Sequence, residues 1–311
     1  MRYVDLHCDT LTACFDKAYS LSNGDLQTNF TKLDNSGCAV QCFAIFTQGA
    51  NAEHRFKDYL GFYRRSICEH GIKAVLNYSD LESSLRGGRT GAILTVENLG
   101  FVKELSELEA LAKAGVKMAS LVWNFENQFA YPNLIFEGET PLFERRNLEG
   151  LKPLGRSAVE LLDSLKIIID ISHLSDGGAD ELLNGRKIPL VASHSNCASV
   201  CNVSRNLTDL QIKKIADCGG VVGVNFCKDF LGEGDIFDCV LKHINHLIKT
   251  GGEDVVAFGS DFDGIPAPPR LEDCTKMPSL LKFLEDRGLK GKTLEKLLYK
   301  NFARVFKEIC G

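Results

Sequence analysis

Short apolar runs alternate with amphipathic stretches along almost the whole chain. The runs are near-continuous, as in "IIIDIS" and "VVGVNF", which is typical of parallel strands that are covered on both faces. The pattern predicts strands at residues 3–8, 39–46, 91–97, 117–123, 167–172, 190–194, 220–226 and 255–260. Between them, apolar residues recur with helical spacing, most clearly at residues 52–70, 157–165, 209–218 and 240–250.

Eight strands with intervening helices predict an α/β fold, namely a single TIM-type (β/α)8 barrel that occupies residues 1–311 as one domain. A ninth apolar run, at residues 72–77, ends without useful polar groups and is placed outside the barrel. An open, doubly wound sheet is the alternative, but no glycine-rich phosphate turn follows the first strand. After the last strand, a proline-rich loop leads to two extra helices that either close the bottom of the barrel or mediate association.

The composition narrows the range of partners. A net charge of −5 with mixed acidic and basic residues offers no basic face, which argues against nucleic-acid binding. No apolar run reaches the roughly 20 residues that span a membrane, and no signal peptide precedes the first strand. We therefore expect a cytoplasmic protein without a membrane partner, in which the twelve cysteines are reduced and mostly buried.

Five of the eight predicted strands end in a residue type that binds metals. In a parallel barrel the chemistry lies where strands end and loops begin, so these side chains are expected to converge. Together they form a mixed nitrogen and oxygen set that suits zinc. They are His7 and Asp9 in the first strand, Glu97 in the third, His173 in the fifth, His194 in the sixth and Asp261 in the eighth.

The first strand shows why the spacing matters. Strand alternation predicts that His7 and Asp9 point into the barrel mouth while Leu6 and Cys8 face the helices. Asp5 would share the inner face one step deeper, and we expect it to orient a metal-binding imidazole. Four other histidines are expected on solvated helix faces, although two of them could chelate at a spacing of three: His54, His70, His243 and His246.

Six motifs carry a resemblance to a known family. In order along the chain they are "DLHCDT", "TVENLG", "LKIIIDISHLS", "PLVASHSN", "SRNLTDLQI" and "GSDFDGI". The chain resembles the membrane (renal) dipeptidase family of the amidohydrolase superfamily from residue 3 to about residue 308. The resemblance implies two zinc ions per chain in the barrel mouth. One ion would be bound by His7, Asp9 and Glu97 and the other by Glu97, His173 and His194, with Glu97 as the bridge.

Two features of the sequence favour a glutamate-bridged site. Other amidohydrolases often have His-x-His on the first strand and a carboxylated lysine on the fourth. Here the first strand has His-x-Asp, and Lys117 lies at the beginning of the fourth strand, which is the wrong end. The resemblance implies catalytic roles for Glu97, as the bridging ligand, and for Asp261. A hydroxide bridging two zinc ions would attack the carbonyl of the peptide bond.

The resemblance also implies how a dipeptide would be bound. Arg205 matches the family's arginine that clamps the C-terminal carboxylate. Asp261 matches the acid that contacts the amino group and could relay a proton to the leaving amine, with Asp263 as a competitor for that role. Nothing in the sequence shows a dimer surface, although a homodimer is compatible with a barrel of this kind.

The fourth strand departs from the family pattern. Many members have a Thr-His pair here, whereas this chain has Trp123 and Asn124. Trp123 either forms a wall of the substrate pocket or is a buried aromatic, and Asn124 could donate a hydrogen bond in place of the lost imidazole. The alternatives to a dipeptidase are an amidohydrolase for N-acyl amino acids, lactones or cyclic amides, and a barrel that binds without catalysis.

Overall fold

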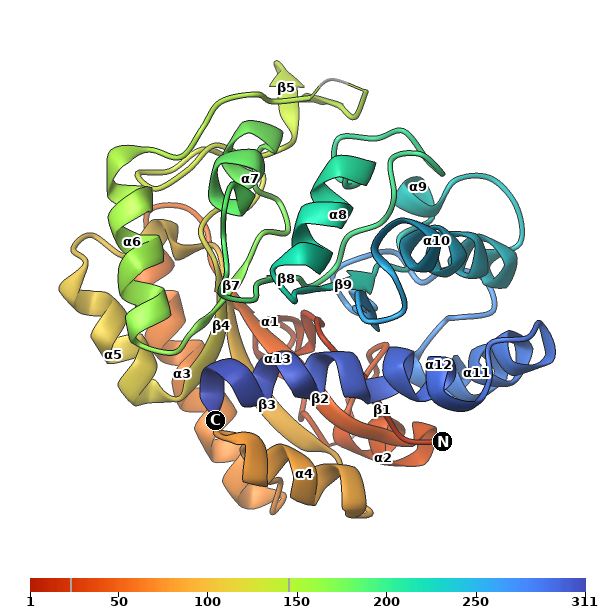
Figure 1. Cartoon of the computed structure of the whole chain (residues 1–311). Helices are drawn as coiled ribbons and strands as arrows, with labels where there is room; N and C mark the ends of the chain where they lie inside the picture. The colour runs from red at the N-terminus through yellow and green to blue at the C-terminus, as the bar shows by residue number, and fades with distance from the viewer. Residues whose placement is uncertain (23, 145) are drawn as a thin grey trace.

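The computed structural model describes residues 1–22, 24–144 and 146–311. Eight parallel strands close into a barrel in the order β1-β10-β9-β8-β7-β4-β3-β2, which confirms the predicted (β/α)8 fold (Figure 1). The barrel strands are β1 (Tyr3–Asp5), β2 (Cys38–Phe46), β3 (Gly91–Glu97), β4 (Val116–Ser120), β7 (Ile168–Asp170), β8 (Val191–Ala192), β9 (Val221–Val224) and β10 (Val256–Phe258). The run at 72–77 lies outside the barrel and forms a bridge from Ala74 to Ala92.

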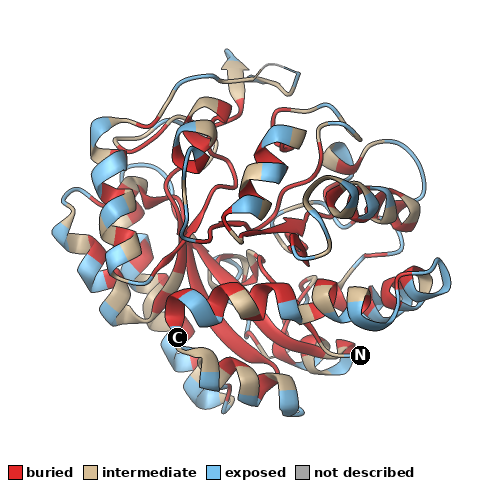
Figure 2. Cartoon of the chain, viewed as in Figure 1, coloured by how far each residue is buried: buried red, intermediate tan, exposed pale blue. Residues whose placement is uncertain are grey.

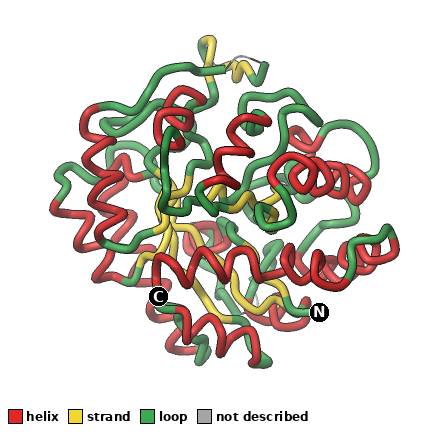
Figure 3. Tube along the Cα trace, viewed as in Figure 1, coloured by secondary structure: helices red, strands yellow, loops and turns green. Residues whose placement is uncertain are grey.

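A ring of helices surrounds these strands, and most of the remaining chain is loop (Figure 3). The helices before the seventh barrel strand are α1 (Thr10–Asp16), α2 (Phe30–Ser36), α3 (Ala52–Glu69), α4 (Tyr78–Arg86), η1 (Leu99–Phe101), α5 (Ser106–Ala114), α6 (Pro153–Ser164), α7 (Asp176–Leu183) and α8 (Asp209–Asp217). After it come α9 (Lys228–Leu231), α10 (Ile236–Gly251), η2 (Cys274–Lys276), α11 (Met277–Asp286), α12 (Gly291–Glu295), η3 (Lys296–Lys300) and α13 (Asn301–Cys310). A hairpin of β5 (Ile135–Glu137) and β6 (Thr140–Leu142) stands apart from the barrel sheet.

Six of the eight barrel strands are shorter than predicted, and most of the missing residues are at their C-terminal ends, whereas β2 and β3 reach the predicted ends. The fifth predicted strand ran to residue 172, but β7 ends at Asp170 and His173 has a φ of 68°. The last strand ends at Phe258, and Asp261 has a φ of 65°. Left-handed backbone cannot continue a strand and is rare outside glycine. At these two strands the chain therefore leaves the sheet just before the side chain that enters the mouth, whereas Glu97 is the last residue of β3.

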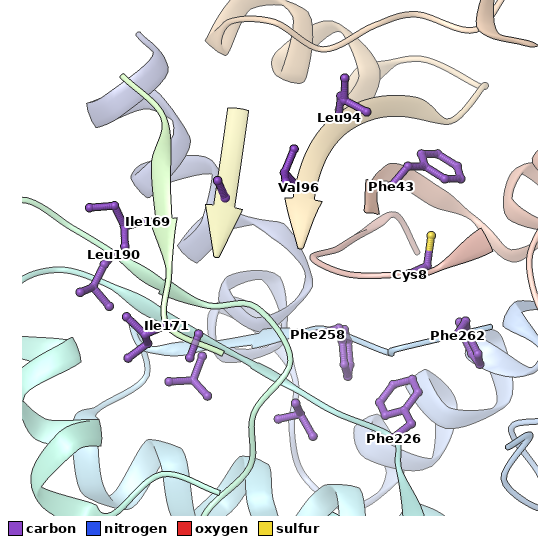
Figure 4. Packing of buried hydrophobic residues seen from close by; sticks show 14 of the residues in the cluster. Cys8, Phe43, Leu94, Val96, Ile169, Ile171, Leu190, Phe226, Phe258 and Phe262 are labelled. Carbon is purple, nitrogen blue, oxygen red and sulfur yellow. The ribbon is translucent and has the colours of Figure 1, made fainter. Parts of the chain in front are cut away.

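The core has two layers, and the buried residues in Figure 2 follow the strands and the inner faces of the helices. The outer layer lies between the strands and the helices, where Phe226 packs edge-on against Phe258 and Phe262 (Figure 4). The inner layer fills the barrel at the end where the strands begin. It contains Val4, Leu6, Val40, Cys42, Ile93, Met118, Ile168, Val191, Val221 and Ala257.

Helix α13 closes this end of the barrel. Its residues Phe302 and Phe306 belong to the inner layer, and the helix contacts β9 and β10. Figure 1 shows α13 running across the barrel. Of the two roles expected for the C-terminal helices, α13 therefore performs closure of the bottom. Because apolar side chains fill this end, the polar side chains of the site lie at the opposite end of the barrel.

The prediction that Leu6 faces the helices was wrong, whereas Cys8 does lie in the outer layer. Asp5 is opposite Gln41 of β2, but the hydrogen bonds of Cys8 with Cys42 O and Ala44 N place Cys8 opposite the residue between them. From Asp5 to Cys8 the first strand advances three residues, whereas β2 advances only two, from Gln41 to Phe43. The extra residue on the first strand is a β-bulge. The bulge breaks the alternation, so that Leu6 faces the interior although its neighbour His7 enters the site.

We expect replacement of Phe306 by alanine to lower the free energy of unfolding by about 3–5 kcal/mol, because the ring is fully buried between α13 and the barrel. Denaturant unfolding followed by circular dichroism measures the change. Glu308→Ala, at an exposed position on the same helix, is the matched control and should change it by less than about 0.5 kcal/mol. Equal effects of the two substitutions would show that α13 does not plug the barrel.

Candidate metal centre

Five side chains from four strand ends meet in the barrel mouth. They fall into two groups whose ligand atoms all lie within 4.8 Å of one another, and Glu97 belongs to both. The groups are His7, Asp9 and Glu97, and Glu97, His173 and His194. These are the two ligand sets that the sequence motifs imply.

Glu97 has the geometry of a bridging group. Its Oε1 lies 3.0 Å from His173 Nε2 and 3.5 Å from His194 Nε2. Its Oε2 lies 3.9 Å from His7 Nε2, which in turn is 3.4 Å from Asp9 Oδ2. The two oxygens of one carboxylate therefore face two different sets of ligands, as a bridge between two cations requires.

The donor atoms fit a cation rather than a set of hydrogen bonds. His7 Nε2 is buried and has no hydrogen-bond partner among the described residues. The Nε2 atoms of His173 and His194 approach each other to 2.9 Å. His173 Nδ1 lies 2.8 Å from Asn124 Oδ1, which can only accept, so Nδ1 carries the proton and Nε2 presents a lone pair. Buried nitrogen lone pairs beside carboxylates match the ligand chemistry of zinc.

The electrostatics also call for added positive charge. Burial, with the nearby charge of Asp9, raises the pKa of Glu97 well above its usual value. Burial alone would lower the pKa of His7, but Glu97, Asp9 and Asp261 outweigh it and raise the value to about 10. Burial and the charges of His7 and Arg205 lower the pKa of both His173 and His194. Without a metal, a proton on His7 therefore supplies the charge that the carboxylates require.

Asp261 reaches the same cluster from the other side. Its Oδ1 lies 3.7 Å from His7 Nε2, and it forms a third potential group with His7 and His194. Its Oδ2 accepts a hydrogen bond of 2.9 Å from Asn225 Nδ2, and burial raises its pKa to about 6. The sequence reading missed Asn225, whose only signal was its place at the end of the seventh strand in "VVGVNF".

Asp263 lines the same pocket as Asp261, but protein groups already donate hydrogen bonds to its carboxylate. Its carboxylate accepts hydrogen bonds from Gln27 N at 2.7 Å and Thr28 N at 3.1 Å, and from the hydroxyl of Thr10 at 2.5 Å. These donors use both oxygens. Asp263 therefore ties the loop before α2 to the end of the last strand.

Arg205 is buried beside the histidines, with 3% of its surface exposed. Its Nη2 donates to His194 O at 3.3 Å and lies 3.2 Å from His173 Nε2. The guanidinium stacks over Phe230, with its central carbon 5.3 Å from the ring centroid. Its Nη1 is buried and has no partner among the described residues. A buried guanidinium with a free nitrogen is suited to an anionic ligand.

The cluster opens into a pocket of about 470 Å³ that also contains Arg205, Asp261 and Asn124. Trp123 lines this pocket and packs against Phe46, with ring centroids 4.7 Å apart, while its contact with a substrate stays a prediction. Other aromatic walls were not predicted and come from the β5–β6 hairpin, the residue after it and α9: Phe136, Phe143 and Phe230.

The remaining histidines lie away from this site. The prediction of a solvated position was wrong for His243, which is fully buried, accepts from Cys197 N at 3.1 Å and contacts Leu231 O. His246 instead lies 2.7 Å from Asp209 Oδ1. Of the twelve cysteines, all of them in described parts of the chain, ten are buried. None of the helices in the described ranges has the length and apolar character that a membrane crossing requires.

A parallel barrel with clustered histidines and carboxylates at its C-terminal mouth is typical of metal-dependent barrel enzymes. More specifically, the model of the membrane dipeptidase family, peptidase family M19, matches residues 1–310, and the chain belongs to this family.

The chain is similar to several known proteins. An uncharacterized protein in the pqqA 5′ region of Klebsiella pneumoniae is 35% identical over 246 residues, covering 76% of this chain and 89% of the relative. An uncharacterized dipeptidase of Schizosaccharomyces pombe is 30% identical over 304 residues, covering 90% and 72%. The crystal structure of dipeptidase AC, a metallopeptidase of family M19, superposes with a TM-score of 0.92 at 26% identity and covers 100% of this chain and 99% of its own.

Zinc binding to the metal-free protein is expected to release protons at pH 7. The pKa of His7 is raised to about 10, so its imidazole is protonated at this pH, and only the neutral form can bind a metal. Calorimetric titration in two buffers of different ionisation enthalpy gives the number of protons released. His7→Gln should release about one proton fewer. The same release from both proteins would contradict this account of the charges.

Proposed function

We propose that this chain is a zinc-dependent dipeptidase with two zinc ions in the barrel mouth. His7 and Asp9 would hold one ion, His173 and His194 the other, and Glu97 both. The support is the shared carboxylate, the unpartnered Nε2 of His7 and the facing Nε2 atoms of the other two histidines. When bound, two zinc ions supply a water that is acidic near neutral pH and a Lewis acid for the carbonyl oxygen.

The observation that carries the dipeptide assignment is the buried, unpaired Nη1 of Arg205 in the same pocket as Asp261. Arg205 forms no direct ion pair among the described residues, and a substrate carboxylate would accept hydrogen bonds from its free nitrogen. Asp261, on the same pocket, suits the amino group at the other end. A cavity of about 470 Å³ with a cation and an acid on its wall fits a small zwitterion.

Asp261 is also placed to move a proton. Its Oδ2 is fixed by Asn225, whereas Oδ1 faces the metal cluster. A carboxyl group whose pKa is raised to about 6 can hold and release a proton near neutral pH. We assign to Oδ1 the transfer of a proton to the amine that leaves when the peptide bond breaks.

Asn124 takes over part of the role of the missing fourth-strand histidine. Its Oδ1 is bound to His173, so its Nδ2 is the group left to donate toward the pocket that it lines. We propose that this amide holds the oxygen of the reacting carbonyl. The aromatic walls around it, including Trp123 and Phe136, favour substrates with apolar side chains.

A second candidate is hydrolysis of N-acyl amino acids. Arg205 would bind any free carboxylate, and only the acidic group of Asp261 separates the two substrate classes. Lactones and cyclic amides without a carboxylate leave the guanidinium unpaired and are disfavoured.

The substrate assignment is tested with free dipeptides, their N-acetyl derivatives and tripeptides, each assayed with and without zinc. We expect free dipeptides to be cleaved fastest, because the N-acetyl derivatives lack the amino group for Asp261 and tripeptides place their two charged ends farther apart. Arg205→Lys should lower kcat/KM for dipeptides by about 10–100-fold, since lysine keeps the charge but loses the planar pair of donors. The exposed Arg287→Lys is the control and should change nothing. N-acetyl dipeptides cleaved as fast as free ones would refute amine recognition by Asp261.

A further inference from the structure

Two buried aspartates that belong to neither ligand set hold the strand ends beneath the site. Asp5 on β1 and Asp170 on β7 are 1% and 6% exposed. The Oδ1 of each accepts from the backbone N of a serine on the neighbouring strand end, at 2.9 Å in both cases: Ser260 for Asp5 and Ser193 for Asp170. The Oδ2 of each accepts from the hydroxyl of the same serine, at 2.6 Å and 2.5 Å. We call these two pairs the aspartate clamps.

The clamps occupy equivalent places in the chain. Ser193 directly precedes His194, and Ser260 directly precedes Asp261. Each aspartate also accepts from the backbone N two residues further along its own strand, Ser172 at 2.9 Å for Asp170 and His7 at 3.4 Å for Asp5. Each clamp therefore ties two adjacent strand ends at the level where site residues begin. Asp5 was expected to orient an imidazole, but its contacts are with backbone and with Ser260.

The position of Ser193 is narrowly fixed. A Cβ atom at Gly223 would lie 2.0 Å from the Ser193 carbonyl oxygen, and one at Gly259 would lie 1.7 Å from it. Only glycine allows β9 and the end of β10, which lie on the same side of β8, to come this close to Ser193. The Ser193 hydroxyl therefore keeps a defined position relative to its neighbours.

The clamps differ in what the serine oxygen contacts next. Ser193 Oγ lies 2.7 Å from His194 Nδ1, whereas Ser260 Oγ contacts the backbone, at His7 O and Phe262 N. Ser193 has one hydroxyl proton, which it donates to the acceptor-only carboxylate of Asp170. Its oxygen must then accept from His194. This fixes the proton on His194 Nδ1 and leaves a lone pair on Nε2, the atom 3.5 Å from Glu97 Oε1.

We propose that Asp170 is a positioning residue that acts through Ser193 on His194, setting its tautomer and strengthening its Nε2 as a metal ligand. The proposal rests on the metal site of the proposed function. His173 has a different support, the neutral amide of Asn124. One imidazole of this pair is thus held by an amide and the other by a buried carboxylate through a hydroxyl group. Carboxylate support raises the basicity of a ligating imidazole.

The test is Asp170→Asn, with Asp5→Asn as the matched control. An asparagine amide at position 170 would donate to Ser193 Oγ, so the hydroxyl would turn and donate to His194 Nδ1. The proton of His194 would then move to Nε2 and block the ligand atom. At position 5 the same change acts on a serine that contacts no imidazole among the described residues. Both substitutions disturb a clamp, but only one should reach His194.

Two readouts are needed. Nitrogen-15 NMR of the histidine rings in the metal-free protein gives the tautomer, and competition with a chelator gives the zinc affinity of the loaded protein. Asp170→Asn should move the His194 proton from Nδ1 to Nε2 and weaken binding of one zinc ion by about 10–100-fold. Asp5→Asn should leave the tautomer of His194 unchanged, and its affinity for that zinc ion should stay within about twofold of the parent protein's.

Ser193→Ala provides an independent variant with a smaller change in the core. It should lower the affinity for the same zinc ion by a similar factor. The double variant with Asp170→Asn should bind that ion little more weakly than either single variant, because both substitutions break the same relay. Unchanged His194 tautomer and zinc affinity in Asp170→Asn, or equal losses from Asp5→Asn, would overturn the proposal. If the parent protein binds no zinc, the proposed function fails, while the NMR comparison in the metal-free protein still decides the relay.

Discussion

The carboxylate of Glu97 is the group on which the arrangement of this mouth depends. A buried carboxylate is stable only if it is neutral, paired or bound to a metal. Glu97 faces His7 with one oxygen and two further imidazoles with the other, all within 3.9 Å. The neighbours are buried as well, so solvent cannot relieve their charges. One or two cations bound between Glu97 and these imidazoles would therefore be shared by several closely spaced ligand atoms.

Apolar burial elsewhere in the barrel offsets the cost of burying these polar groups together. One end is filled by aliphatic residues from every strand and closed by α13, which supplies the apolar burial. The opposite end receives polar residues from several strands at once, because parallel strands all finish there. Left-handed backbone at His173 and Asp261 turns these residues out of the sheet and into the mouth. The apolar end therefore stabilises a fold whose other end holds buried polar side chains and residues with left-handed backbone.

Much of this could be predicted from the sequence, for a physical reason. Covered parallel strands are apolar, so a histidine or an acid at the end of such a run stands out, and the closed topology then brings these residues together. The register between neighbouring strands and the packing of individual side chains could not be predicted from the sequence. The bulge that turns Leu6 inward leaves no mark on the alternation, and burial of His243 depends on packing against Cys197 and Leu231. The hairpin that brings Phe136 to the pocket had no recognisable strand pattern.

The polar supports were equally hidden, because serine, asparagine and aspartate at strand ends are also common in ordinary turns. Asn225, Ser193 and Asp170 acquire meaning only from their contacts with Asp261 and His194. A ligand set can therefore be recognised from motifs, whereas the hydrogen bonds that orient it require the fold.

The central claim is that one glutamate bridges two zinc ions. Crystals of the zinc-loaded protein, measured on both sides of the zinc absorption edge, test it directly. The account predicts two anomalous peaks about 3.5–4 Å apart, with one Glu97 oxygen on each. A single peak, or two peaks of which one has no contact with Glu97, would contradict it.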